Sequence, residues 1–162
     1  MNSERAARFA RLSRKGKLNR QRQVGALCWR KRGEKLQVLL ITSRDSGRWL
    51  IPKGWPMDDR ASRNVALLEA WEEAGVTGSV QKEAIGSFKY HKGIDEDFSV
   101  PCKVAVFSVE VDKIAKHFPE VDQRRQKWFS PKKASRMVVE PQLRKIIRNF
   151  EVEDEKGIAK KN

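Results

Sequence analysis

Three glutamates, Glu69, Glu72 and Glu73, lie within five residues of one another in the run LEAWEEAGV. In a helix this spacing places all three on one face, where each like-charged pair costs about 0.2–0.5 kcal/mol. No Lys or Arg stands three or four residues from Glu69 or Glu73 to relieve the repulsion. Clustered carboxylate oxygens on a rigid face are the ligands that Mg²⁺ and Mn²⁺ prefer. The spacing therefore favours a divalent-metal site, and the alternative is a solvated acidic face.

The segment that carries these glutamates has the period of an amphipathic helix from Ser62 to Ala74. Ser62 is the predicted N-cap, because its hydroxyl can accept a hydrogen bond from a free backbone N–H group, and Gly75 is the predicted stop. The apolar stripe of this helix follows the spacing i, i+3, i+4, i+7 and consists of Leu67, Ala70, Trp71 and Ala74. This stripe would pack on the core and leave the glutamates on the opposite face.

Around this helix the sequence alternates between β-rich and helical segments. Strands are predicted at 24–29, 36–42, 79–90, 100–111 and 126–130, and the turn-like run RKRGEK joins the first two as a hairpin. Helices are predicted at 131–138 and 141–150, each with a Pro at its first position. A chain of 162 residues with 39% hydrophobic residues can form one globular domain with a core. The elements indicate a domain of mixed α and β structure.

The residues that flank the glutamates extend the pattern. Gly54 precedes them in PKG, and the run ends with Glu72, Glu73, Ala74, Gly75 and Val76. This stretch resembles the Nudix box: Gly, five residues, Glu, seven residues, Arg-Glu-aliphatic, one residue, Glu-Glu, one residue, Gly-aliphatic. The runs GRWLIPKGW and VVEPQLRKII are similar to the branch of diphosphoinositol polyphosphate phosphohydrolases and diadenosine polyphosphate hydrolases. The resemblance covers roughly residues 23–150 and implies an α+β fold, an α/β/α sandwich with a mixed β-sheet between helices.

The same resemblance implies a hydrolase that cleaves a P–O–P linkage with Mg²⁺ or Mn²⁺ as cofactor. A bridging cation allows a polyanionic substrate to approach a carboxylate face, and it lowers the pKa of bound water. Glu69, Glu72 and Glu73 are the predicted metal ligands. The proton of the attacking water would go to one of them, with Glu73 and Glu69 as candidates, or to Glu120 in the segment FPEVDQRR.

Two positions depart from the box, because Arg60 stands where the pattern has its first Glu and Leu68 stands where it has Arg. The resemblance implies that the missing Glu assists the metal site and that the missing Arg steers carboxylates. Asp58 or Asp59 could replace the lost carboxylate, and Arg60 could fold back to replace the lost guanidinium. The alternative is a slow enzyme, or one whose substrate does not need these groups.

Basic residues near the box are the predicted contacts for substrate phosphates, since Arg offers a bidentate fork and Lys a point charge. The resemblance implies that Ser43 and Arg44 touch phosphate. The other predicted substrate-binding residues are Arg48, Lys53, Gly54 and Lys89, and the further bases Lys103, Arg124 and Arg125 lie on or near predicted strands. The expected substrate is a diphosphoinositol polyphosphate, a diadenosine polyphosphate or a related nucleotide. For each base taken singly, an ordinary surface role is the alternative.

The net charge of +14 favours an anionic partner. Residues 1–22 hold eight Lys or Arg against one Glu and residues 151–162 hold three bases against four acids, so residues 23–150 carry the remaining +8. We therefore expect a basic arm (1–22), a Nudix domain (23–150) and a flexible tail (151–162). An Arg-rich start also resembles an organelle presequence. The arm could bind nucleic acid, so the second functional candidate is an RNA-binding or RNA 5′-pyrophosphohydrolase module with weak catalysis.

The remaining features bear on the cellular setting. No apolar run approaches the roughly 18 residues that crossing a membrane requires, so we expect no membrane association. Cys28 and Cys102 lie in apolar runs and favour buried free thiols in a reducing cytoplasm, with a disulfide as the alternative. The expected oligomeric state is a monomer or a homodimer.

Overall fold

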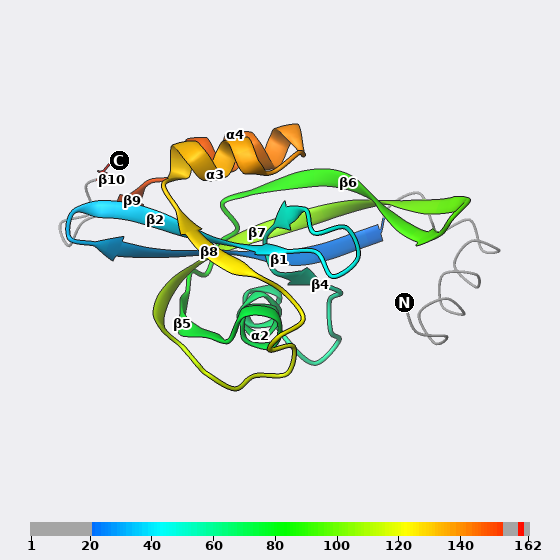
Figure 1. Ribbon diagram of the computed structural model, residues 1–162, viewed down its shortest axis with the longest axis horizontal. Coiled ribbons are helices and arrows are strands. Elements are labelled where there is room, and N and C mark those ends of the chain that lie inside the picture. Colours follow the sequence, from blue (N-terminus) through cyan, green and yellow to red (C-terminus); the bar gives the residue numbers. More distant parts are fainter. Residues whose placement is uncertain (1–20, 154–158, 161–162) are drawn as a thin grey trace.

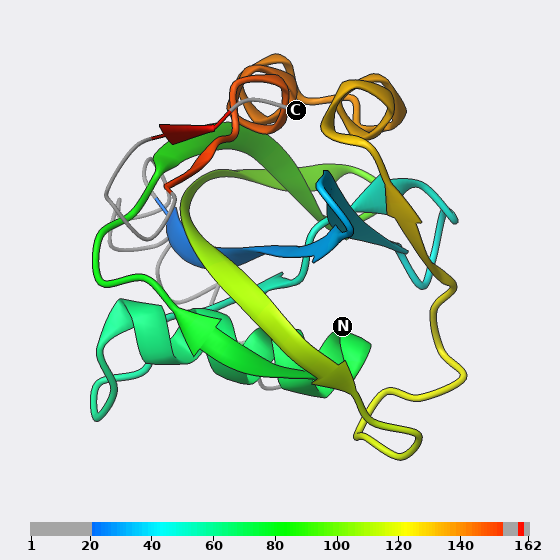
Figure 2. The same cartoon turned by 90° about the vertical axis from the view of Figure 1, so that its left-hand side faces the viewer.

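The computed structural model describes residues 21–153 together with 159 and 160. Eight strands form one mixed sheet: β1 (Gln21–Arg32), β2 (Lys35–Thr42), β3 (Trp49–Leu50), β4 (Lys53–Gly54), β5 (Val76–Val80), β6 (Gly86–Asp95), β7 (Phe98–Ile114) and β8 (Gln126–Phe129). Helix α2 (Ser62–Ala74) lies below this sheet, and helices α3 (Pro131–Met137) and α4 (Pro141–Arg148) lie side by side above it (Figure 1, Figure 2). The predicted α/β/α sandwich is confirmed.

The sheet is mixed because one central pair of strands is parallel. Strands run in the order β3-β2-β1-β7-β5, with β4, β6 and β8 attached to β1, β7 and β2. Only β1 and β7 pair in parallel in this sheet, with Val24 opposite Ala105, and its other pairs are antiparallel. The predicted hairpin is present as β1 and β2, with Arg32 opposite Lys35 and Gly33 in the turn at φ +63°.

The predicted strand 79–90 is wrong as a single element. Both β5 and β6 pair with the same edge of β7, and the ladder continues through Gln81, which donates to the Ser108 carbonyl, and Ile85, which donates to the Val106 carbonyl. Residues 82–84 therefore loop out of an otherwise continuous partner strand. Hydrophobic alternation does not detect such a bulge, because the strand pattern resumes on both sides of it.

The ends of the domain also differ from the sequence-based boundaries. Strand β1 begins at Gln21, so the last two residues of the predicted arm belong to the sheet, and the rest of the arm lies outside the described residues. In the predicted tail, β9 (Val152–Glu153) pairs antiparallel with β10 (Ala159–Lys160). None of the helices in the described part of the chain combines the length and the apolar character needed to cross a bilayer.

Apolar side chains cover both faces of the central strands, so β1 is hydrophobic along most of its length. Leu27 and Trp29 pack with the residues under α3 and α4, whereas Ala26 and Cys28 pack with those above α2. Both cysteines are buried and free, which confirms the thiol prediction and rules out the disulfide. Burial raises the pKa of Cys28 to about 12, so this thiol is a core side chain and not a nucleophile.

Helix α2 begins one residue earlier than its predicted cap implies. Ala61, with φ −63° and ψ 148°, is the N-cap and offers no side-chain hydrogen bond, and Ser62 is the first helical residue. The predicted stop is confirmed, since Gly75 adopts φ +71° and its N–H donates to the Trp71 carbonyl at 2.9 Å. This left-handed stop turns the chain directly into β5.

Gly75 has a second constraint, because a Cβ at this position would overlap the Phe118 ring. We expect Gly75→Ala to lose about 2–4 kcal/mol of unfolding free energy, the sum of left-handed backbone strain and overpacking. Gly33→Ala is the matched control, since Gly33 has φ +63° but nothing within 4 Å of its added Cβ. Urea unfolding of both variants measures the difference. Equal losses would show that the Phe118 contact contributes nothing.

Candidate active site

The three glutamates of α2 do not share one solvent-facing surface. Glu73 is only 7% exposed and belongs to the buried side of the helix, whereas Glu69 and Glu72 are half-buried. The buried residues of α2 are Val65, Ala66, Ala70, Glu73 and Ala74, while Leu67 and Trp71 of the predicted stripe are half-buried. Residues 66, 70 and 74 are all alanine, and such small side chains allow the helix to lie close to the sheet. Glu73 belongs to the same buried side of the helix.

Glu73 forms an ion pair with Arg124, a residue far from it in the sequence. A guanidinium nitrogen of Arg124 lies 3.7 Å from Glu73 Oε1, and Nε of Arg124 donates to Glu120 Oε1 at 3.2 Å. Burial raises the pKa of Glu73, and the Arg124 guanidinium only partly offsets this effect. Glu69, one helical turn before Glu73, is a neighbouring carboxyl group that also acts to lower the pKa of Glu73. The local field therefore favours a proton or a further cation beside this carboxylate.

Glu120 reaches the helix because the loop between β7 and β8 is fastened to it. The Glu120 backbone N–H donates to the Glu72 carbonyl at 2.9 Å, close to the C-terminal end of α2. This loop runs past α2 in Figure 1. Glu69, Glu72, Glu73 and Glu120, here called the glutamate site, thus come from one helix and one distant loop.

Gly54 leaves space for the carboxylate of Glu69. It lies in β4 opposite Val24, and a Cβ added to it would overlap the carboxylate of Glu69. The position therefore requires the absence of a side chain and not an unusual backbone conformation. Gly54 was predicted among the substrate-binding residues, and its structural contact is with a predicted metal ligand.

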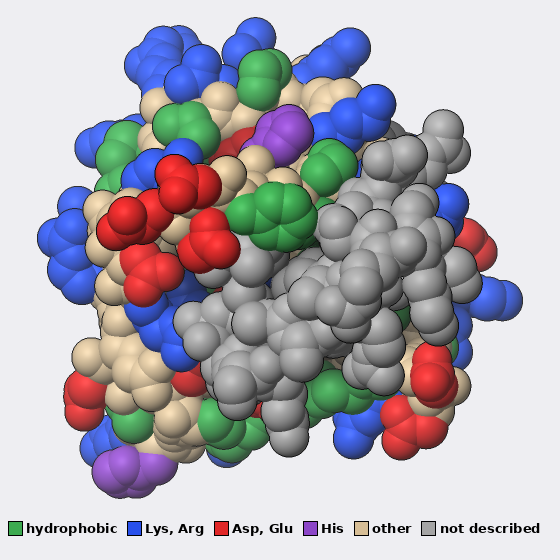
Figure 3. All heavy atoms as spheres, turned by 90° about the vertical axis from the view of Figure 1, so that its right-hand side faces the viewer, with side chains coloured by type: hydrophobic (Ala, Val, Ile, Leu, Met, Phe, Trp, Pro, Cys, Tyr) green, Lys and Arg blue, Asp and Glu red, His purple; other side chains and the backbone are tan. Residues whose placement is uncertain are grey.

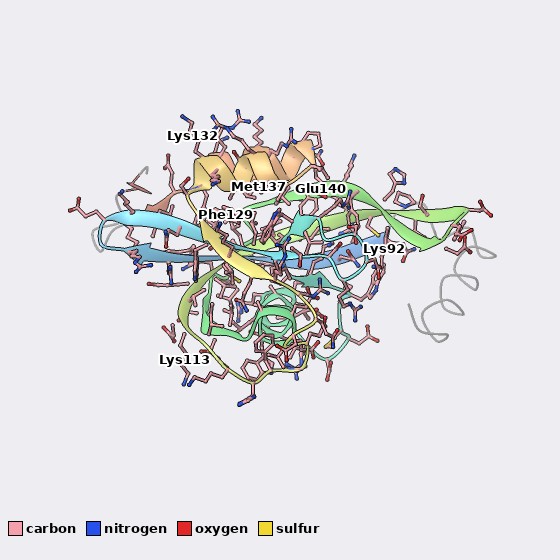
Figure 4. All side chains as sticks on the ribbon, viewed as in Figure 1. Lys92, Lys113, Phe129, Lys132, Met137 and Glu140 are labelled. Carbon is pink, nitrogen blue, oxygen red and sulfur yellow. The ribbon has the colours of Figure 1, made fainter. Side chains whose placement is uncertain are left out.

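Lys53 points to the opposite face of the sheet from Gly54, since side chains alternate along a strand. Its Nζ lies 5.0 Å from the centre of the Tyr90 ring, and the Tyr90 hydroxyl donates to Gln23 Oε1. Burial lowers the pKa of Lys53 to about 8, while the charges of Glu73 and Glu140 act in the opposite direction. Glu140 lies on the α3–α4 side (Figure 4), and its Oε1 is buried without a hydrogen-bond partner among the described residues.

The other predicted substrate-binding residues fall into two groups. Arg44 reaches the site, with Nε 3.9 Å from Glu120 Oε1 and a hydrogen bond of 3.3 Å to Gln123 Oε1. Ser43 lies next to it, and its hydroxyl bonds the Ser46 hydroxyl in the turn before β3. Arg48 and Lys89 are exposed, and within the described part of the chain their side chains form no ion pair with the glutamates.

Sequence reasoning named Arg124 only among the bases that could contact substrate phosphates, and not as a partner of the glutamates. The proposed substitute, Arg60, is exposed in the turn before α2, as are Asp58 and Asp59, so the guanidinium beside Glu73 comes from Arg124 and not from Arg60. Arg124 stands 51 positions after Glu73, and no spacing rule links the two. The only local signal is its position four residues after Glu120.

A divalent cation fits the donor chemistry of the site. Carboxylate oxygens are hard ligands, and Glu69 and Glu73 lie one turn apart on the same helix. In their present positions, however, no three Asp, Glu, His or Cys side chains within residues 21–153 and 159–160 converge on one point that could hold an ion. Arg124 lies between Glu73 and Glu120, so these predicted site carboxylates are paired with a guanidinium.

Comparison with known proteins assigns the family. The family model described as NUDIX domain matches residues 19–150, which is most of the chain. The chain belongs to the Nudix family. The glutamate site therefore lies in a Nudix domain.

Curated relatives in Arabidopsis thaliana share this domain. The chain is 33% identical over 105 residues to Nudix hydrolase 13, mitochondrial, an alignment that covers 62% of this chain and 52% of that protein. It is 29% identical over 119 residues to Nudix hydrolase 4, which covers 71% of this chain and 54% of that protein. The chain thus spans about half the length of these relatives.

Solved structures show the same fold at low sequence identity. The Escherichia coli dihydroneopterin triphosphate pyrophosphohydrolase has a TM-score of 0.62 at 13% identity, with 80% of this chain and 93% of that chain covered. A Caenorhabditis elegans Ap4A hydrolase has a TM-score of 0.57 at 16% identity and covers 79% and 93%. The NUDIX domain of Shewanella oneidensis NrtR, complexed with ADP ribose, has a TM-score of 0.59 at 16% identity and covers 90% and 95%.

The contact between Gly54 and Glu69 leads to a test of the site. We expect Gly54→Ala to displace the Glu69 carboxylate and to weaken Mn²⁺ binding about tenfold, because misplacing one ligand disturbs the whole set. Isothermal titration calorimetry measures the affinity, and circular dichroism checks the fold. Gly93→Ala is the control, since its Cβ would meet nothing within 4 Å. An unchanged affinity in Gly54→Ala would remove Glu69 from the ligand set.

Proposed function

We propose that this Nudix protein is a divalent-metal-dependent pyrophosphohydrolase that cleaves a P–O–P linkage in a polyanionic substrate. The observation that carries the proposal is the buried carboxylate of Glu73, with Glu69 one helical turn away and the Glu120 backbone bonded to the same helix, in a Nudix domain. Such a carboxylate is costly to bury unless a cation compensates it. The surrounding domain carries a net positive charge, which attracts a polyphosphate.

Each residue of the site has a distinct part in this proposal. Glu69, Glu72 and Glu73 would hold Mg²⁺ or Mn²⁺, which when bound polarises phosphoryl oxygens and lowers the pKa of water. The Glu120 side chain is 21% exposed, and in this proposal it would accept a proton from a water molecule. Arg44, with a side chain that is 53% exposed, can contact a phosphate beyond the reacting one.

The chemistry near Lys53 favours a nucleotide over a fully phosphorylated ring. Lys53 supplies one positive charge, but the nearby Glu140 has a buried oxygen that lacks a donor. A carboxylate in this position repels additional phosphates and can accept hydrogen bonds from a base or a sugar. Structural neighbours include proteins described as Ap4A hydrolase and as bound to ADP ribose. We therefore rank diadenosine polyphosphates and related nucleotides above diphosphoinositol polyphosphates as candidate substrates.

A phosphate-release panel tests the function. Diadenosine polyphosphates, ADP-ribose, a diphosphoinositol polyphosphate and triphosphorylated RNA are compared with Mg²⁺ and with Mn²⁺. We expect Glu73→Gln to lower turnover of the preferred nucleotide about 100-fold or more, because it removes a ligand charge and a candidate base while keeping the side-chain size. Glu83→Gln, in the exposed loop between β5 and β6, is the control and should leave turnover unchanged. Metal-independent turnover, or an active Glu73→Gln variant, would refute the proposal.

A second candidate, RNA 5′-pyrophosphohydrolase activity or RNA binding, is favoured by one surface. Lys and Arg side chains project along the upper margin of Figure 3, over α3 and α4. The exposed bases of these two helices are Lys132, Lys133, Arg136, Arg144, Lys145 and Arg148. Their only acidic neighbour within residues 131–150 is the half-buried Glu140. This basic surface is separated from the glutamate site by the sheet.

Salt dependence tests this surface. If it binds RNA through phosphates, the combined change of Lys132, Lys145 and Arg148 to Gln should flatten the plot of log affinity against log salt. Each lost phosphate contact on single-stranded RNA should reduce the slope by roughly 0.7. The control changes Lys113 and Lys116 to Gln; these are exposed bases on the opposite side, where Figure 4 labels Lys113. Identical slopes in all proteins would exclude the α3–α4 surface.

A further inference from the structure

The Nudix box of this chain lacks its guanidinium, because Leu68 occupies the position of the box arginine. An arginine there would lie one helical turn before Glu72 and could hold a carboxylate in place. Leu68 is half-buried and has no charge or hydrogen-bonding group. The metal ligands of the proposed enzyme therefore need another partner to fix their orientation.

Arg124 has the contacts that such a partner requires. Its Nε donates to Glu120 Oε1 at 3.2 Å, and one terminal nitrogen lies 3.7 Å from Glu73 Oε1. The other terminal nitrogen donates to the Thr42 carbonyl at the end of β2, at 3.1 Å. The guanidinium is thus held on three sides, and the side chain is only 10% exposed.

The sheet fixes the backbone that carries Arg124. Thr42 N–H donates to the Arg125 carbonyl at 3.0 Å, and Arg125 N–H donates to Thr42 Oγ1 at 2.9 Å. These two bonds tie the residue after Arg124 to the end of β2. Because the loop is also tied to α2 through Glu120 and Glu72, Arg124 spans the gap between helix and sheet.

We propose that Arg124 is the positioning residue of the glutamate site and supplies, from the loop before β8, the guanidinium that the box lacks at Leu68. This inference rests on the proposed metal-dependent function. Arg124 orients Glu73 through its contact with Oε1, and the Glu73 carboxylate so held would be one of the groups that bind the cation. It also keeps Glu120 beside the ligands.

Burial and neighbours separate this role from substrate binding. Arg44 is mostly exposed beside Glu120 and can turn toward a phosphate, whereas Arg124 is enclosed by a carbonyl and two carboxylates. Arg125 points elsewhere, with its guanidinium 5.5 Å from the centre of the Trp49 ring. Removing Arg125 therefore changes the charge of the same segment without touching the glutamates.

The measured quantity is Mn²⁺ affinity in the absence of substrate. Loss of an outer-shell partner of metal ligands typically weakens the metal by 10- to 100-fold, so we expect Arg124→Leu to bind Mn²⁺ about tenfold more weakly. Adding Leu68→Arg to Arg124→Leu should restore most of the affinity, because a guanidinium returns to the glutamates from the box position. Arg125→Leu, the matched control, should bind as the unchanged protein does.

Each outcome bears on a different claim. Equal or tighter Mn²⁺ binding by Arg124→Leu would overturn the positioning role, since a guanidinium that merely competes with the ion would give tighter binding. A weakened variant that Leu68→Arg does not rescue would also overturn it. If Arg124→Leu fails to fold, Arg124→Lys replaces it; we expect weaker binding, because an ammonium group cannot hold both carboxylates, and unchanged affinity counts against the role. No Mn²⁺ uptake by the unchanged protein would instead refute the proposed function.

Discussion

The burial of Glu73 is the constraint on which the site depends. A carboxylate on the buried side of α2 loses hydration, and burial raises its pKa. It can remain there only with a proton or a cation beside it. In this chain the compensating group is the Arg124 guanidinium, which lies 3.7 Å from Glu73 Oε1. The same electrostatic demand is the physical basis of the metal site proposed above.

At β4 the two faces of the sheet differ in chemistry. Gly54 turns toward α2 and leaves room for Glu69, and Lys53 turns toward Tyr90 on the other face. Two adjacent residues thus join the glutamates to a polar region that contains Glu140. In the proposed enzyme the first face would handle the reacting phosphates and the second would recognise the rest of the substrate.

Much of the fold was accessible from sequence because local patterns encode it. The hairpin of β1 and β2, the helix ending at Gly75 and the two proline-initiated helices each follow from turn residues, caps and periodicity within a short window. The errors in the predicted elements also concern short segments. The helix starts after Ala61, not after a capping Ser62, and residues 82–84 leave the strand ladder without breaking its alternation.

The sequence by itself determined that carboxylates gather on one helix, that a glycine precedes them and that the chain resembles the Nudix family. Only the tertiary structure decided which glutamate is buried and which cation faces it. Helical periodicity orders residues around an axis, but the depth of each side chain depends on how closely the helix lies on the sheet. Arg124 meets Glu73 because a loop is fastened to both β2 and α2, and such long-range contacts leave no fixed spacing in the chain.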